Sequence, residues 1–353
     1  MASLSYAPPT SPAHGRADLR AAYGSLPGEP CALAGATMGT TWSARLVLPA
    51  PVAADAVRAA MQGALDDVVA QMSNWEADSD ITRYNRSAPG WVELPAPLLE
   101  VLDYGLWLAE ASDGAYDPAV GALVQAWGFG PHPRAGAPDL RQPSEATGLP
   151  RRAGTPPGPE AIDAARSRSG WRRIRRDGAR AWQAGGTELD FSSIAKGYGV
   201  DRAARALDRL GVADYLVEVG GELRARGRRP DGRPWRVAVE SPDGGAHAAR
   251  LALDGCAIAT SGDYRRYAEH DGKRYAHTLD PRSGRPVDNG VASVTVAHAG
   301  CMQADALATA LTVLGEQAGM AFARQHGLAA LFILRTPAGL RSVATPPMAA
   351  LAA

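Results

Sequence analysis

The sequence is poor in the features that mark several common protein classes. Its 353 residues include only three cysteines, Cys31, Cys256 and Cys301, whose wide spacing fits neither a disulfide framework nor a zinc pattern. Lys plus Arg and Asp plus Glu are both 37, so the basic excess typical of nucleic-acid or membrane-surface binding is missing. Seven scattered histidines argue against a His-rich metal site. We therefore expect no nucleic-acid partner.

Long apolar runs are missing as well. The N-terminal segment is rich in Pro, Ser and Ala and lacks the basic start and the apolar stretch of roughly 7–15 residues that define a secretory signal. Nowhere does an apolar run approach the roughly 20 residues of a membrane span. We expect no membrane span, a cytoplasmic location, and a disordered lead-in over residues 1–36.

Standard catalytic signatures are also absent. The phosphate-binding pattern GxxxxGK[ST] and the dinucleotide fingerprint GxGxxG after a strand do not occur. Neither do HExxH, GxSxG or the kinase set. Function must therefore be sought in less common constellations.

What is present indicates a folded protein with a substantial core, since 46% of residues are hydrophobic and 21% are charged. Apolar periodicity predicts helices over 55–73, 97–114, 194–212 and 301–315. Strand patterns cover 41–48, 170–191 with an Asp-Gly turn, 215–227 around a Gly-Gly, 235–242, 250–267, 291–299 and 328–336. Because these elements lack a regular βαβ rhythm, an α+β fold is favoured. The Pro-, Gly- and Arg-rich segment 131–160 is expected to be a loop insertion.

The apolar helix over 301–315 contains two polar residues, Asp305 and Thr309. They are four positions apart and so share one helix face, directed into what reads as protein interior. A buried carboxylate needs compensation. Both side chains offer hard oxygen donors of the kind that Mg²⁺ prefers. The alternative is that Asp305 caps the helix and Thr309 bonds back to its own backbone.

Three further stretches combine polar residues with turn-forming ones. Asp117 directly precedes a proline, which suits a helix N-cap. Ser192 and Lys196 flank a helix start, where free N–H groups either bind phosphate or are satisfied by capping. His277 and Asp280 lie in a segment broken by Pro and Gly, which fits a binding loop or a salt-bridged surface turn.

Taken together, these stretches resemble one family in one order. The chain resembles the ApbE family, the FAD:protein FMN transferases, over about residues 37–336. The matching segments are MGTTW (38–42), MSNWEADSDITRYN (72–85), DGAYDPAVGALVQAWGFG (113–130), DFSSIAKGYGVDRAA (190–204), VEVGGELRARG (217–227), YAHTLDPRSGRPV (275–287) and SVTVAHAGCMQADALATALTVLG (293–315). Seven collinear segments are far more specific than any one of them.

The resemblance implies a single large domain, residues 37–345, of mixed and largely antiparallel sheets packed with helices. It also implies an enzyme that splits FAD and, with Mg²⁺, attaches FMN through its phosphate to a Thr of a target flavoprotein, releasing AMP. The implied metal ligands are Asp305, Thr309 and the backbone carbonyl of Ala195. The implied FAD-site positions are Met38, Trp75, Ala115, Tyr116, Asp117, Ser192, Lys196, Tyr198, His277 and Leu279.

The chain departs from the family pattern at two points. Trp75 stands where the family usually carries Tyr, which keeps an aromatic face for stacking but removes a hydroxyl. The family is often exported, whereas this N-terminus shows no export signal. In addition, the stretch AGAT (34–37) resembles part of the family's acceptor motif, but it lacks the upstream Asp, so self-modification is not expected.

For the chemistry, His277 is the candidate general base because the ordinary pKa of histidine lies near neutrality. Asp280 is the second candidate. Two other functions stay open at this point: an FAD pyrophosphatase, in which water replaces the acceptor Thr, and a flavin-binding protein without catalysis.

Overall fold

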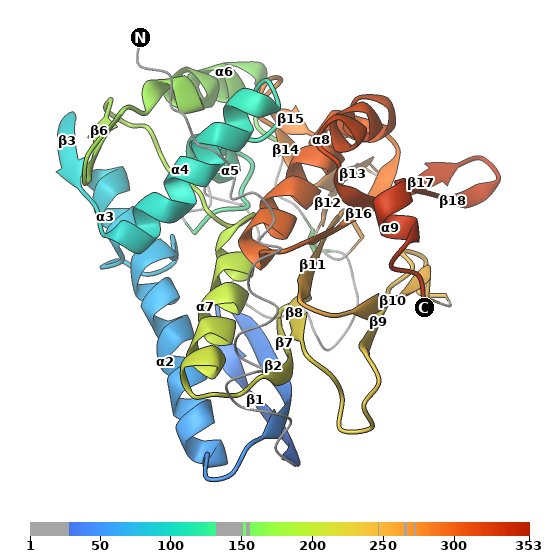
Figure 1. Ribbon diagram of the computed structural model, residues 1–353. Helices are drawn as coiled ribbons and strands as arrows, with labels where there is room; N and C mark the ends of the chain where they lie inside the picture. The colour runs from blue at the N-terminus through green and yellow to red at the C-terminus, as the bar shows by residue number, and fades with distance from the viewer. Residues whose placement is uncertain (1–27, 132–150, 153–155, 246, 265–266, 272) are drawn as a thin grey trace.

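The computed structural model describes residues 28–131, 151–152, 156–245, 247–264, 267–271 and 273–353 (Figure 1). Its centre is an eight-stranded sheet in which neighbouring strands all pair antiparallel, in the order β1-β2-β7-β8-β11-β16-β17-β18. These strands are β1 (Glu29–Thr37), β2 (Thr40–Leu48), β7 (Asp214–Val219), β8 (Glu222–Arg226), β11 (Cys256–Gly262), β16 (Val291–His298), β17 (Ala329–Thr336) and β18 (Gly339–Ala344).

Smaller sheets surround this centre. Their strands are β3 (Gly90–Glu93), β6 (Arg180–Gln183) and β5 (Arg176–Asp177); β9 (Trp235–Val239) and β10 (Ala249–Leu253); β13 (Lys273–Ala276), β12 (Tyr267–His270) and β4 (Arg151–Arg152); and β14 (Leu279–Asp280) and β15 (Arg285–Pro286). Of the described pairings only β4 with β12 is parallel. The expected α+β fold with largely antiparallel sheets in a single domain is confirmed.

Some helices pack directly on the central sheet, and others pack against helices. They are α2 (Ala54–Met72), α3 (Asp80–Arg86), α4 (Ala96–Ala111), α5 (Gly121–Ala126), α6 (Pro159–Arg168), α7 (Ala195–Arg209), α8 (Cys301–Gln325), α9 (Pro346–Ala349) and the short 3₁₀ helix η1 (Trp171–Arg173). Helix α7 packs against both α2 and α8, and α8 packs on β11 and β16 (Figure 1). All four helices expected from apolar periodicity are therefore present.

Two of the expected boundaries differ from the structure. Residues 29–36 were expected in the lead-in, but they form strand β1, which pairs with β2 along its whole length. Residues 1–27 lie outside the described residues, as does most of the expected insertion, 132–150 and 153–155. At the end of that segment, β4 and the start of α6 are regular structure rather than loop.

Two tight hairpins bring backbone close to helix α7. Met38 and Gly39 between β1 and β2 have φ of 49° and 68°, and Gly220 and Gly221 between β7 and β8 have φ of 58° and 106°. Positive φ at both central residues is typical of the primed turns that match the twist of antiparallel strands. The expected strand pair around Gly-Gly is thus confirmed.

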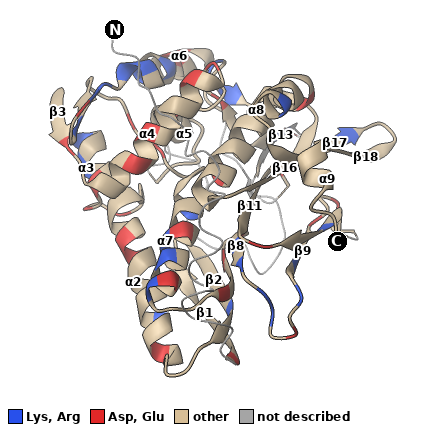
Figure 2. Cartoon of the chain, viewed as in Figure 1, with Lys and Arg blue, Asp and Glu red and all other residues tan. Residues whose placement is uncertain are grey.

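Helix α8 forms the centre of the core. It continues past the expected end at Gly315, where φ of 78° and ψ of −176° interrupt the helix. Of the helices described, α8 is the one long and apolar enough to cross a membrane, but 67% of its most apolar window is buried within the protein. It is a core helix. Acidic and basic residues intersperse over α2 and α7, in line with the zero net charge (Figure 2).

Candidate active site

The first turn of α7 crosses α8 at very short range, and this crossing places Asp305. A Cβ added to Gly197 would lie 2.3 Å from the Cys301 carbonyl oxygen and 2.8 Å from the Asp305 Cβ. Only glycine lets the two helices approach so closely. The approach allows the Gly197 N–H to donate a hydrogen bond of 3.0 Å to Asp305 Oδ2.

Two further charged side chains lie beside Asp305. Lys196, the residue before Gly197, forms an ion pair of 2.5 Å between its Nζ and Oε1 of Glu222, the first residue of β8. Burial raises the pKa of the Asp305 carboxyl, while the Lys196 ammonium and the Gly197 N–H act in the opposite direction. Burial also raises the pKa of Glu222, Lys196 lowers it and Asp305 raises it further. The three groups therefore interact within one buried cluster.

Thr309 lies one turn beyond Asp305 and is half-buried. Within the described residues its hydroxyl makes no hydrogen bond, whereas the Thr312 hydroxyl donates to the Ala308 carbonyl at 2.8 Å. Asp305 does not cap its own helix either, because α8 begins at Cys301. The capping and back-bonding alternative for the Asp305–Thr309 pair is therefore not observed.

The chemistry of these donors fits a hard divalent cation. Among the residues that the structure describes, no group of three His, Cys, Asp or Glu side chains could hold a metal. A cation here would thus depend on a mixed oxygen set: the Asp305 carboxylate, the Thr309 hydroxyl and the carbonyl of Ala195, the half-buried first residue of α7. Mg²⁺ takes one or two carboxylates and completes its sphere with water and substrate phosphate, so this set suits it.

The turn after α4 meets the start of α7 through Tyr116. The Ser193 hydroxyl donates to the Tyr116 oxygen at 3.3 Å. Tyr116 is buried, which raises its pKa, and the carboxylates of Asp305, Asp190 and Asp117 raise it further. Tyr116 therefore joins the expected flavin segment to the Asp305 cluster. Ala115 beside it is also buried.

Asp117 fixes the shape of this turn. Its carboxylate accepts hydrogen bonds from the Ala119 N–H at 2.8 Å and the Trp171 N–H at 3.1 Å. Burial raises its pKa to about 6, with the two N–H groups and Arg172 opposing the rise. The expectation that Asp117 is a helix N-cap is wrong, because α5 begins only after Val120. Instead it caps a local turn and ties it to η1.

The loop that contains His277 and Asp280 packs against the same turn. A Cβ on Gly114 would lie 3.7 Å from Arg282 Cγ. Asp280 accepts two hydrogen bonds of 2.9 Å from the Arg282 side chain, so its carboxylate is already engaged. Leu279 is buried among α5 and α6 residues, and His277 is half-buried just before β14. The salt-bridged turn, the alternative to a binding loop, therefore exists at Asp280 and Arg282.

The remaining expected FAD-site residues differ in their surroundings. Met38, in the β1–β2 turn, packs over Gly199 of α7. Trp75 is 47% exposed, and Ser192 is exposed at the entry to α7. Tyr198 is buried in the core and its hydroxyl donates to Glu100 on α4 at 2.9 Å. The Tyr198 hydroxyl thus bonds to α4, whereas Asp305 of α8 accepts its hydrogen bond from the backbone of Gly197.

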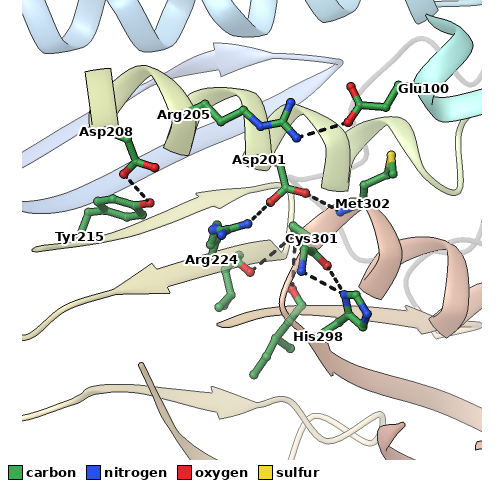
Figure 3. A network of polar contacts seen from close by, with 12 residues as sticks. Glu100, Asp201, Arg205, Asp208, Tyr215, Arg224, His298, Cys301 and Met302 are labelled. Atoms are coloured by element: carbon green, nitrogen blue, oxygen red, sulfur yellow. Dashed lines mark hydrogen bonds and ion pairs between the residues drawn. The ribbon is translucent and has the colours of Figure 1, made fainter. Parts of the chain in front are cut away.

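Two residues of this region escape sequence reasoning. Glu222 directly follows the Gly-Gly turn, a position where a charged side chain is usually solvated, but it is only 3% exposed. Asp201 on α7 accepts the Met302 N–H at 3.0 Å and the Arg224 guanidinium at 2.6 Å (Figure 3). It thereby satisfies the N-terminus of α8 from a neighbouring helix. For Asp201, which helical spacing groups with buried Gly197 and Ala204, a charged residue at a buried position was an available signal. Strand alternation groups Glu222 with Arg224 and Arg226, so the sequence gives no such signal there.

Comparison with known proteins shows to which class this fold belongs. The family model described as "ApbE family" matches residues 38–332. An FAD:protein FMN transferase of Vibrio cholerae is 37% identical over 326 residues, covering 90% of this chain and 92% of the relative. One of Haemophilus influenzae is 35% identical and covers 87% of each chain.

Solved structures agree with these relatives. The apo form of the Pseudomonas stutzeri flavinyl transferase ApbE superposes with a TM-score of 0.81 at 38% identity, covering 92% of this chain and 97% of that one. The ApbE protein of Thermotoga maritima gives a TM-score of 0.79 at 27% identity. The chain belongs to the ApbE family. The family resemblance seen in the sequence, and the expectation of a transferase enzyme, are confirmed.

Proposed function

We propose that this protein transfers FMN from FAD to a Thr hydroxyl of a target flavoprotein in a Mg²⁺-dependent reaction that releases AMP. The observation that carries the proposal is the Asp305 cluster: at the N-terminus of α7, a buried carboxylate lies one helical turn from the Thr309 hydroxyl, which makes no hydrogen bond to the described residues. Such a helix N-terminus favours phosphate. The names of the relatives supply the substrate, FAD, and the kind of acceptor, a protein.

Asp305, Thr309 and the Ala195 carbonyl would hold the cation, which when bound neutralises pyrophosphate charge and stabilises the leaving phosphate. The chain's own residues bind and orient the substrate. Lys196 adds a fixed positive charge beside Asp305. The exposed ring of Trp75 offers a face for stacking on the flavin, and the Asp117 carboxylate fixes the turn that follows Tyr116.

In the transfer, the acceptor Thr oxygen forms a bond to the phosphorus on the riboflavin side of FAD. The bond from that phosphorus to the AMP oxygen breaks, and AMP leaves with the electron pair. His277 accepts the proton of the Thr hydroxyl. Asp280 is less suited to this role, because Arg282 engages both of its oxygens.

The test is AMP release from FAD and Mg²⁺, with and without a protein bearing the acceptor motif. The proposal expects AMP only with acceptor, together with a covalent flavin on that acceptor. Equal AMP in both reactions with free FMN would instead establish a pyrophosphatase. Binding of FAD without AMP release in either reaction would establish a flavin-binding protein.

A further inference from the structure

Glu222 is a buried member of the Asp305 cluster, and one oxygen of its carboxylate has no hydrogen-bond partner among the described residues. Only 3% of the residue is exposed. Its Oε1 pairs with Lys196 Nζ at 2.5 Å, while its Oε2 has no hydrogen-bond partner within the described part of the chain. An unsatisfied buried carboxylate oxygen is costly and is typical of a group whose partner arrives with a ligand.

The surrounding backbone holds Lys196 in place from a second side. A Cβ added to Gly220 would lie 2.9 Å from Thr40 Cγ2 and 3.5 Å from Lys196 Cδ. The Gly220 N–H also donates to the Thr41 carbonyl at 3.1 Å. The Gly220 turn and Glu222 therefore contact Lys196 at its stem and at its ammonium, and the ammonium also interacts electrostatically with Asp305.

The charges of the cluster explain why a second carboxylate is useful. Asp305 and Glu222 contribute two negative charges and Lys196 one positive charge. With both carboxylates ionised and Lys196 protonated, the cluster would have a net charge of about −1, which attracts a divalent cation. Without Glu222 the Lys196 ammonium alone neutralises Asp305 and competes with the cation for it.

We infer that Glu222 is a positioning residue of the cation site, which anchors Lys196 and preserves the negative charge that the cation needs. This inference rests on the Mg²⁺ site of the proposed function. Glu222 acts through Lys196 and through the field at Asp305. Its effect is therefore on the affinity for the cation and not on the bond-breaking step itself.

The experiment measures Mg²⁺ binding directly, by isothermal titration of the full chain, alongside steady-state kinetics. Glu222→Gln is expected to weaken Mg²⁺ binding by about 10- to 100-fold, the range for residues that orient metal ligands. The apparent KM for Mg²⁺ rises equally, whereas kcat at saturating Mg²⁺ stays within about threefold. Glu316→Gln, at an exposed pair with Arg341, is the matched control and leaves binding unchanged.

A double variant keeps the test decisive if Glu222→Gln folds poorly. Lys196→Gln with Glu222→Gln removes one charge of each sign and leaves the net charge of the cluster unchanged. Its Mg²⁺ affinity is expected to recover to within about threefold of the wild-type value, since charge balance is restored. A folded Glu222→Gln variant that binds Mg²⁺ as tightly as the wild type overturns the inference. A double variant that binds Mg²⁺ tenfold more weakly than the wild type overturns it too. A wild-type chain that binds no Mg²⁺ refutes the proposed function instead.

Discussion

Gly197 offers a sharp test of how the site is built. In Gly197→Ala the new methyl group would lie 2.3 Å from the Cys301 carbonyl oxygen and 2.7 Å from its carbonyl carbon. Both are backbone atoms of α8, so no side chain can rotate away. Because ordinary contact begins at about 3.4 Å, α7 and α8 must separate by about 1 Å.

The magnitude follows from three effects. Overpacking of this kind costs about 1–3 kcal/mol. Loss of the Gly197 N–H hydrogen bond to the Asp305 carboxylate adds about 1.5–3 kcal/mol. The higher helix propensity of alanine raises the unfolding free energy by about 1 kcal/mol. We expect a net loss of about 1.5–5 kcal/mol in unfolding free energy.

The assay is urea unfolding together with Mg²⁺ titration of the native protein. Gly63→Ala on α2 is the matched control, because a Cβ there meets nothing within 4 Å. It is expected to gain about 0.5–1 kcal/mol. If Gly197→Ala is as stable as the control and binds Mg²⁺ as the wild type does, the close helix crossing does not hold the site.

Three further predictions concern other parts of the site. Asp117 has a folded pKa of about 6 against an ordinary 3.8, so its contribution favours folding below pH about 4 and is lost as the pH rises to about 6. Between pH 4 and 7 the unfolding free energy of the wild type should fall by up to about 3 kcal/mol more than that of Asp117→Asn. An equal fall in the unfolding free energy of both proteins would contradict this. Asp201→Ala removes the acceptor of the Arg224 guanidinium and the Met302 N–H, so it should lower the unfolding free energy, measured with denaturant, by about 3 kcal/mol. The control Asp177→Ala, at an exposed ion pair, should lower it by at most about 0.5 kcal/mol. Trp75→Ala should weaken FAD binding about tenfold, measured by fluorescence titration, with unfolding free energy within about 0.5 kcal/mol of the wild type, because the ring is 47% exposed. A variant that binds FAD normally would exclude stacking on this ring.

Much of the fold follows from periodicity, and the exceptions have physical causes. The segment over β1 contains Pro, Gly and several Ala, which have low strand propensity. It is a strand because it pairs with β2, where the Trp42 ring lies over Gly35 and a Cβ on Gly35 would lie 2.5 Å from Trp42 Nε1. Tertiary pairing overrides local propensity here, so the sequence pattern alone could not reveal it.

The end of α8 shows a second limit. Gly315 reads as a helix C-cap, and its φ of 78° agrees with that interpretation. The helix nevertheless resumes, because Asn289 from a distant loop donates to the Thr312 and Val313 carbonyls at 2.9 and 3.4 Å. A side chain far away in sequence thus satisfies the carbonyls that a helix end leaves open.

Within the site, motifs inside one segment could be predicted from the sequence, but contacts between segments could not. Asp305 and Thr309 could be predicted as a pair because helical spacing alone places them on one face. The Lys196–Glu222 pair spans two elements, so nothing in either segment indicates it. The same holds for Asp117, whose partner Trp171 lies 54 positions away.

The crossing of α7 and α8 has a consequence for how this protein acquires activity. The bond between Gly197 and Asp305 closes a loop of 108 residues, and that loop contains β7, β8, β11 and β16 of the central sheet. Contacts of such long range form only after the intervening strands have paired, since loop closure must be compensated by their packing. No fragment that ends before α8 can assemble the cluster. If the proposed cation site exists, binding of the cation is therefore a late and cooperative property of the whole domain, and it reports on native folding more stringently than helix content does.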